Sequence, residues 1–312
     1  MNKELKILAV VIFFTLLTYW GVEPFAHGEM HKHVEGEGFT YKELKASGKS
    51  GDAAKGKELI MGAGACTGCH GIKAAGMPAP MDASTAAASY GVNPPDLSTA
   101  GALYDEKFLA ALIKNPAHAL NVEHKFEADS GRTHPMSSFF GAGGDMDQEI
   151  ADMVAYLKSI APKEISNKEA FVDACGRCHA MRYSKWTQLG DTPKFKYEKD
   201  TLGYKVKVLE YQDSLKAYMG KLPPDLSIII RARGEHFLKT FVEDPQAQLP
   251  GTSMPRVGLT AEGYEKVEAY LSEVGDPSKP ARESLGWKVM LFFVVFSVLA
   301  FLWKKSMWKD LH

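Results

Sequence analysis

Apolar residues gather in two long runs, one near each end of the chain. The first run covers residues 7–22, contains only Thr15 and Thr18 as polar interruptions, and follows Lys3 and Lys6. A run of this length with a basic flank is typical of a signal peptide or of a membrane anchor. No clear A-x-A cleavage pattern follows it. We therefore expect residues 1–26 to form a retained N-terminal transmembrane helix rather than a cleaved segment.

The second run, residues 289–303, is apolar except for Ser297 and is flanked by lysines on both sides. A buried core helix would show a wider polar stripe. We therefore predict a C-terminal transmembrane helix at residues 286–304 and a tail at residues 305–312. The basic residues lie outside both runs, which predicts that both termini are cytoplasmic and that the middle of the chain lies across the membrane.

The middle of the chain repeats one pattern of polar and apolar positions. The sequence Pro-Pro-Asp-Leu-Ser occurs at residues 94–98 and at residues 223–227, and an apolar stripe with helical spacing follows each copy. The stripes consist of Phe108, Leu109, Leu112 and Ile113 in the first copy, and of Phe237, Leu238, Phe241 and Val242 in the second. Each copy closes with a further amphipathic helix. The gap-free match predicts a duplicated all-α domain, at residues 51–161 and 169–276, with a linker at residues 162–168.

Composition adds little to this picture except through cysteine. The chain has 312 residues, of which 45% are hydrophobic and 24% charged, and its net charge of −1 gives no indication of nucleic-acid binding. It has four cysteines, and all of them lie in two short motifs. None is therefore left over for a structural disulfide.

Both motifs read C-x-x-C-H. They comprise Cys66, Cys69 and His70 in the first repeat, and Cys175, Cys178 and His179 in the second. This motif attaches haem c through two thioether bonds, and its histidine ligates the iron. A redox dithiol would accompany a βαβ pattern, which is absent, and a zinc site would need a much shorter gap between the two cysteine pairs. We therefore predict two covalently attached haem c groups.

The sixth iron ligand is predicted to be a methionine in each repeat. Met254 lies in a Ser-Met-Pro loop before the last helix of the second repeat, and Met136 holds the equivalent position in the first. The first repeat has a longer segment between its helix-ending proline and this methionine. Other candidates are the histidines of that segment and more distant methionines, namely His118, His124, His134, Met77, Met81, Met146 and Met219. Methionine opposite histidine raises the reduction potential of a haem.

The order of these elements resembles a class I cytochrome c. It comprises a first helix at residues 51–60, a helix that bears the C-x-x-C-H motif, a proline-rich loop, a methionine loop and a final helix. The resemblance implies an all-α fold of two tandem class I cytochrome c domains with N- and C-terminal transmembrane helices.

A more specific resemblance covers residues 169–312. The segments CGRCHAMRYSKWTQL (175–189) and LPPDLSIIIRARGEHF (222–237), with a W-x-x-L at residues 308–311, resemble cytochrome c1. Residues 51–161 form an additional haem domain that an ordinary cytochrome c1 lacks. The resemblance implies that Arg231 contacts a haem propionate, and it places Pro95 and Pro224 among the haem-binding residues.

The chain as a whole resembles the di-haem cytochrome c1 subunit of a bacterial quinol–cytochrome c reductase, the cytochrome bc1 complex. That resemblance implies an inner-membrane location, periplasmic haem domains and a dimeric complex. It also implies contacts with membrane lipid, a cytochrome b subunit, a Rieske iron–sulfur protein that supplies electrons, and a soluble or membrane cytochrome c that accepts them. The second haem would receive the electron, and the first would deliver it.

Two other classes share some of these features. The di-haem subunit of a cbb3-type oxidase also has tandem haem domains, but its anchor precedes them. A di-haem peroxidase needs one open or switchable haem, which equivalent methionines in both repeats argue against. A histidine cluster at His27, His31 and His33 could bind a metal or sense pH, although a solvated stretch beside the membrane explains it equally simply.

Overall fold

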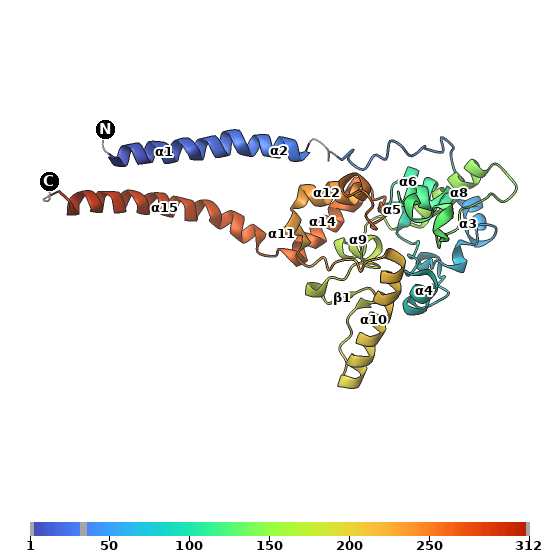
Figure 1. Cartoon of the computed structure of the whole chain (residues 1–312). Coiled ribbons are helices and arrows are strands. Elements are labelled where there is room, and N and C mark those ends of the chain that lie inside the picture. Colours follow the sequence, from blue (N-terminus) through green and yellow to red (C-terminus); the bar gives the residue numbers. More distant parts are fainter. Residues whose placement is uncertain (1–2, 32–35, 310–312) are drawn as a thin grey trace.

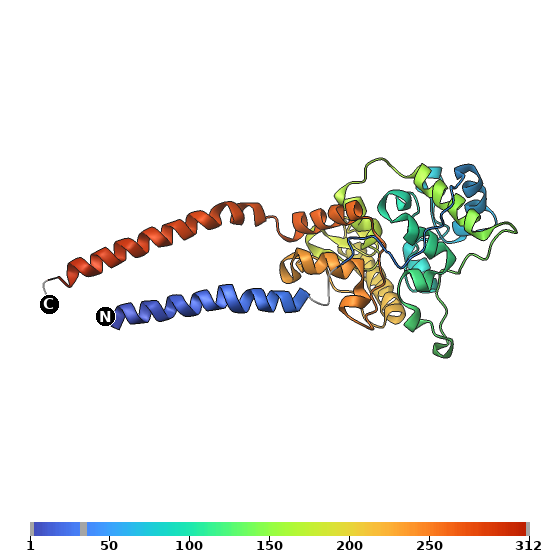
Figure 2. The ribbon, with the colours of Figure 1, turned by 90° about the horizontal axis from the view of Figure 1, so that it is seen from above.

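The chain folds into a helical body from which two long helices extend. The structure, a computed structural model, describes residues 3–31 and 36–309. Figures 1 and 2 show that the two long helices leave the same end of the body and that both chain termini lie at the far end. Lys304 near one far end forms an ion pair of 2.5 Å with Glu4 near the other. The two ends of the chain therefore lie on the same side of the molecule.

The N-terminal helix is continuous but irregular. It consists of α1 (Lys3–Leu17), the π-helical turn η1 (Thr18–Val22) and α2 (Glu23–His31). Pro24 lacks a backbone N–H, so the regular hydrogen bond to Trp20 cannot form, and the π turn directly precedes this position. The predicted N-terminal helix is present and extends five residues beyond the predicted boundary at residue 26.

The C-terminal helix is α15 (Lys279–Met307), which begins before and ends after the predicted range of 286–304. Among the described residues, α15 and the helix over Lys3–Glu29 are long and apolar enough to cross a membrane, and neither buries its apolar window in the body. The predicted tail lies partly outside the described residues, as does Leu311 of the W-x-x-L pattern.

The first repeat folds around a contact between its first and last helices. Its helices are α3 (Ala53–Met61), η2 (Cys66–Gly68), η3 (Lys73–Ala75), α4 (Ala83–Tyr90), α5 (Ala100–Leu103), α6 (Glu106–Lys114), α7 (Pro116–Ala119), η4 (Glu123–Lys125), η5 (Ala128–Ser130) and α8 (Met146–Ile160). Helix α3 crosses α8 closely at Gly56, which has no side chain. A Cβ atom there would come within 1.9 Å of the Asp152 carbonyl oxygen. Leu109 of the predicted stripe on α6 is buried in this core with the inward residues of α8, whereas Phe108 of the same stripe faces the second repeat.

The second repeat follows the same order of helices. It contains α9 (Asn167–Ala174), η6 (Arg182–Ser184), β1 (Trp186–Thr187), β2 (Gly190–Asp191), α10 (Glu198–Met219), α11 (Ile229–Arg233), α12 (Glu235–Glu243), α13 (Pro245–Gln248) and α14 (Ala261–Gly275). Helix α9 packs on α14 as α3 packs on α8. It begins inside the predicted linker, because a capping box between Ser166 and Glu169 starts it early.

Two features differ from the predicted plan. The C-x-x-C-H motifs do not lie on α-helices: the first begins in the short 3₁₀ turn η2, which four residues separate from the end of α3, and the second follows α9 directly. Helix α10 was not predicted, since its pattern lacks a clear apolar face. The N-terminal part of α10 projects from the body (Figure 1), and Leu202, Val206 and Leu209 are exposed along it.

The two repeats share one core. Leu103 and Phe108 of the first repeat pack with Phe171 and Tyr264 of the second. The backbone N–H of Asp105 donates to the Gly258 carbonyl at 2.9 Å. Gly258 adopts φ +77°, and any Cβ there would lie 2.0 Å from the Phe108 ring. The repeats are therefore in fixed contact rather than joined by a loose linker.

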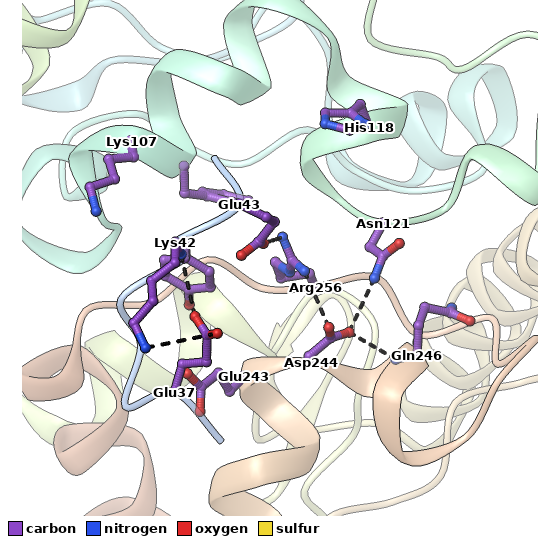
Figure 3. A network of polar contacts seen from close by, with 12 residues as sticks. Glu37, Lys42, Glu43, Lys107, His118, Asn121, Glu243, Asp244, Gln246 and Arg256 are labelled. Carbon is purple, nitrogen blue, oxygen red and sulfur yellow. Dashed lines mark hydrogen bonds and ion pairs between the residues drawn. The ribbon is translucent and has the colours of Figure 1, made fainter. Parts of the chain in front are cut away.

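Residues 36–45, which we call the strap, close the groove between the repeats. Phe39 stacks on Tyr264 with ring centroids 5.1 Å apart, and the Tyr41 hydroxyl donates to the Leu259 carbonyl at 2.9 Å. Arg256, only 6% exposed, pairs with Glu43 of the strap and with Asp244 (Figure 3). Burying an aromatic side chain contributes about 1.5–3 kcal/mol, so the strap adds substantially to the cohesion of the two repeats.

Candidate haem sites

Each C-x-x-C-H motif is wound into one tight turn. The backbone N–H of His70 donates to the Cys66 carbonyl at 2.9 Å, and that of His179 donates to the Cys175 carbonyl at 2.9 Å. This turn brings the two thiols and the imidazole of each motif into one short segment. All four cysteines are free thiols, as haem attachment requires.

The two motif histidines make the same hydrogen bond. His70 Nδ1 lies 2.8 Å from the Pro95 carbonyl oxygen, and His179 Nδ1 lies 2.8 Å from the Pro224 carbonyl oxygen. A carbonyl oxygen can only accept, so Nδ1 must carry the proton in both rings. The Nε2 lone pair is then left for iron, and the hydrogen bond from Nδ1 to the proline carbonyl fixes the orientation of the ring. Pro95 and Pro224 thus act through their backbone oxygens.

The proline-rich turns are themselves held by the following aspartates. Asp225 accepts hydrogen bonds from the backbone N–H groups of Ser227 and Arg182, both at 3.0 Å. Asp96 accepts the corresponding bonds from Ser98 at 2.9 Å and Lys73 at 3.4 Å. Both carboxylates therefore shape the loops that carry Pro95 and Pro224.

Burial sets the protonation of the motif residues. Burial lowers the pKa of His70; the Pro95 hydrogen bond opposes this, and the positive charge of Arg177 adds to the lowering. Burial likewise lowers the pKa of His179. Both rings are therefore neutral near pH 7, which iron ligation requires. Burial raises the pKa of Cys66 and Cys178, and raises that of Cys175 to about 12.

The predicted methionine ligands differ in their surroundings. Met254 packs against the shared core that also contains Cys175. Met136 is half-buried in the longer loop of the first repeat, where its backbone contacts the His134 ring. Met77 and Met146 pack against the core of the first repeat with Cys66, whereas Met219 ends α10. Met254 and Met136 remain the predicted ligands.

Other predicted residues make contacts of their own or are exposed. The exposed His118 ring lies 3.2 Å from Glu123, and His134 packs edge-on against Phe126. Arg231 is exposed on α11. His33 lies outside the described residues, as does the side chain of His31, so the predicted cluster with His27 stays a prediction.

A set of contacts between the two sites was missed from the sequence. It involves Tyr211 of α10 and Arg177, the residue before Cys178. Arg177 could have been noticed as a charge inside the motif, but no local signal connects either residue to the first repeat.

The donor set fits haem c better than a bare metal ion. Among residues 3–31 and 36–309, no group of three or more histidine, cysteine, aspartate or glutamate side chains could hold a metal ion. Each motif instead offers two free thiols and one imidazole nitrogen. This combination suits thioether attachment of a porphyrin and iron ligation from one side.

Comparisons with known proteins agree with this chemistry. The cytochrome c family model matches residues 53–161. The ammonia monooxygenase gamma subunit of Nitrosomonas europaea is 26% identical over 49% of this chain and 88% of its own length. Cytochrome c1 of Allochromatium vinosum is 24% identical over 46% of this chain and 82% of its own length. No solved structure matches the chain. Residues 53–161 thus form a cytochrome c domain, and the comparisons support haem c binding and electron transfer by this part of the chain.

Proposed function

We propose that the second repeat also holds haem c, so that the chain carries two such groups. The observation that carries this proposal is the recurrence of the His70–Pro95 contact at His179 and Pro224, with the same distance of 2.8 Å. Cys175 and Cys178 would form the thioether bonds, and Met254 would be the sixth ligand. When bound, haem c supplies reversible one-electron chemistry.

We further propose that the chain is the di-haem cytochrome c1 subunit of a quinol–cytochrome c reductase. The relative from Allochromatium vinosum supports this, as do the Pro-Pro-Asp-Leu-Ser segment with its following arginines and the apolar helix α15 after the last domain. A Rieske iron–sulfur protein would supply electrons to the second repeat, and the first repeat would deliver them to a soluble or membrane cytochrome c.

The arrangement of the long helices supports an inner-membrane location with both repeats in the periplasm. Both helices leave one end of the body, and their far ends meet in the Lys304–Glu4 ion pair. The helices would hold the body at the membrane surface, beside a cytochrome b subunit in a dimeric complex. Both termini would be cytoplasmic, because their lysines lie beyond the apolar windows.

A second candidate is a subunit of a membrane monooxygenase complex. The relative from Nitrosomonas europaea, described as an ammonia monooxygenase gamma subunit, favours it. The same one-electron chemistry would then serve a different enzyme, and the haem-binding residues would be the same. The two candidates differ in partners rather than in the chemistry of this chain.

Purification of the native chain in a mild detergent tests these assignments. Co-purification with a cytochrome b and a Rieske protein, with quinol-dependent cytochrome c reduction, is the expected result. Co-purification with monooxygenase subunits would instead favour the second candidate. Co-purification with oxidase subunits would indicate the cbb3-type class. Peroxidase activity of the isolated chain would contradict all electron-relay assignments.

A further inference from the structure

The haem-binding segment of the second repeat packs directly against the proximal loop of the first. The segment is residues 173–178, which ends at Cys178, and the loop is residues 93–99, which contains the Pro95 partner of His70. The Tyr104 hydroxyl donates to the Asp173 carbonyl at 3.1 Å, and Thr99 Oγ1 donates to the Asp173 carboxylate. We call this contact the junction.

One buried hydroxyl bridges the two sides of the junction. Tyr211 is 1% exposed, and its hydroxyl donates to the Arg177 carbonyl at 2.9 Å. The same oxygen accepts from the backbone N–H of Asn93 at 3.1 Å. Burial raises the pKa of Tyr211 to about 12, so the hydroxyl keeps its proton near pH 7. It therefore joins the peptide before Cys178 to the residue that precedes Pro94 and Pro95.

Arg177 makes a second bridge in parallel. Its Nη1 donates to the Asn93 carbonyl at 3.1 Å, while its Nε is buried without a hydrogen-bond partner among the described residues. The contact therefore brings a positive charge from the second motif to the loop that orients His70.

The second cysteines of both motifs flank the same helix pair. Cys178 packs against the cluster that contains Tyr211 and Ala87, where α10 meets α4. The Cys69 thiol contacts the Tyr90 hydroxyl at the end of α4 at 3.8 Å. A path from Cys178 to His70 therefore crosses two hydrogen bonds. One joins Arg177 to Asn93, and the other joins Pro95 to His70.

We propose that the junction is the electron-transfer contact between the two haem sites, and that Tyr211 and Arg177 are its positioning residues. The inference rests on the proposed presence of two haem c groups. A hydrogen-bonded path couples two redox centres more strongly than an open gap of equal length. Tyr211 and Arg177 fix that path by tying the His70 loop to the peptide of Cys178.

Tyr211→Phe in the full chain tests the proposal, because it removes the hydroxyl and keeps the ring in its buried site. Tyr218→Phe is the matched control: it lies two turns further along α10 and packs on the same cluster, and its hydroxyl makes no hydrogen bond within the described part of the chain. Haem content and the methionine-to-iron absorption band show whether both sites remain intact. Relaxation of the half-reduced chain after a temperature jump measures electron exchange between them.

We expect Tyr211→Phe to keep both haems and to slow this relaxation several-fold. The amide protons of Asn93 and of residues 96–99 should exchange faster with solvent, since the Asn93 N–H loses its acceptor. Tyr218→Phe should change neither quantity. Unchanged relaxation in a Tyr211→Phe chain with both haems intact would overturn the proposal.

Arg177→Lys provides an independent variant if Tyr211→Phe does not fold. It keeps the charge but loses the guanidinium fork that reaches Asn93, so the relaxation should again slow. An unchanged rate would remove Arg177 from the path. A wild-type chain with one haem would contradict the proposed function itself, whereas two haems with an unaltered rate in both variants would contradict the junction alone.

Discussion

The two repeats share their order of helices and the orientation of the motif histidine, and they differ in two longer segments. The hydrogen bonds from His70 and His179 to the proline carbonyls, and from the backbone N–H groups of Ser98 and Ser227 to Asp96 and Asp225, recur with nearly the same distances. The segments around this frame have diverged. The first repeat carries a long loop before Met136, whereas the second carries α10 before its proline-rich turn. The hydrogen bonds that orient the motif histidine are thus the same in both repeats, while the longer segments of the two repeats contact each other.

The inserted segments contact each other. Arg132 of the first repeat's long loop donates to the Tyr218 carbonyl of α10 at 2.7 Å. Lys125 of the same loop donates to the Met219 carbonyl at 3.4 Å, and Ser253, beside Met254, donates to that same carbonyl. The long loop of the first repeat is therefore held against the C-terminal end of α10.

Removing either cysteine pair gives the largest expected effect and tests whether the repeats are equivalent. Replacing Cys66 and Cys69 with serine should remove about half of the covalent haem, and so should replacing Cys175 and Cys178, because each motif attaches one group. Haem staining on a denaturing gel measures this. Full staining in either variant would show that its motif attaches no haem.

Methionine replacement compares the distal sides of the repeats. Met254→His should keep a six-coordinate iron and lower its reduction potential, since imidazole donates more strongly than a thioether. Met136→His should do the same for the other haem. Potentiometric titration of each variant gives the two potentials, with Met219→Leu on α10 as a control. If Met136→His left both potentials unchanged, the first repeat would use another ligand.

Gly258→Ala tests how tightly the repeats are joined. Its Cβ would lie 2.0 Å from the Phe108 ring, in a backbone with φ +77°. Gly251→Ala is the matched control, because Gly251 has φ +79° and open space around it. In both variants, backbone strain should lower the free energy of unfolding by about 1–3 kcal/mol. Gly258→Ala should lose about 1–3 kcal/mol more from overpacking. Denaturant unfolding that gave equal losses would contradict the tight interface.

Replacing Asp96 or Asp225 tests whether the hydrogen bonds to these carboxylates stabilise both repeats equally. Asp96→Ala and Asp225→Ala each leave loop N–H groups without an acceptor, so each should lower the free energy of unfolding by about 1–3 kcal/mol. Asp213→Ala, which removes an exposed carboxylate on α10, should leave it nearly unchanged. A large loss in one repeat only would show that the two loops are not equivalent.

His118→Ala should have the smallest effect. The ring is exposed and paired only with Glu123, and such a surface pair contributes about 0–1 kcal/mol. The haem absorption spectrum should therefore stay the same as in the wild-type chain. A changed methionine-to-iron band would instead place this histidine at the first haem.

The sequence by itself determined the features that depend on spacing along the chain. The C-x-x-C-H motifs, the duplicated stripes of α6 and α12, and the two apolar helices are each fixed by residues within a turn or a few turns. The cytochrome c character of residues 53–161 followed from these local patterns. Helix α10 could not be predicted from such a pattern, because its apolar residues point partly to α4 and partly to solvent.

Only the tertiary structure decided which distant residues meet. Tyr41 of the strap reaches the carbonyl of Leu259, and Tyr211 of α10 joins Asn93 to Arg177. These pairs are far apart in sequence, and their hydrogen bonds form only because the two repeats are packed in one orientation. Periodicity reports which face of a helix is buried, but it carries no information about which partner covers that face. The geometry between the two motifs therefore had to come from the folded chain.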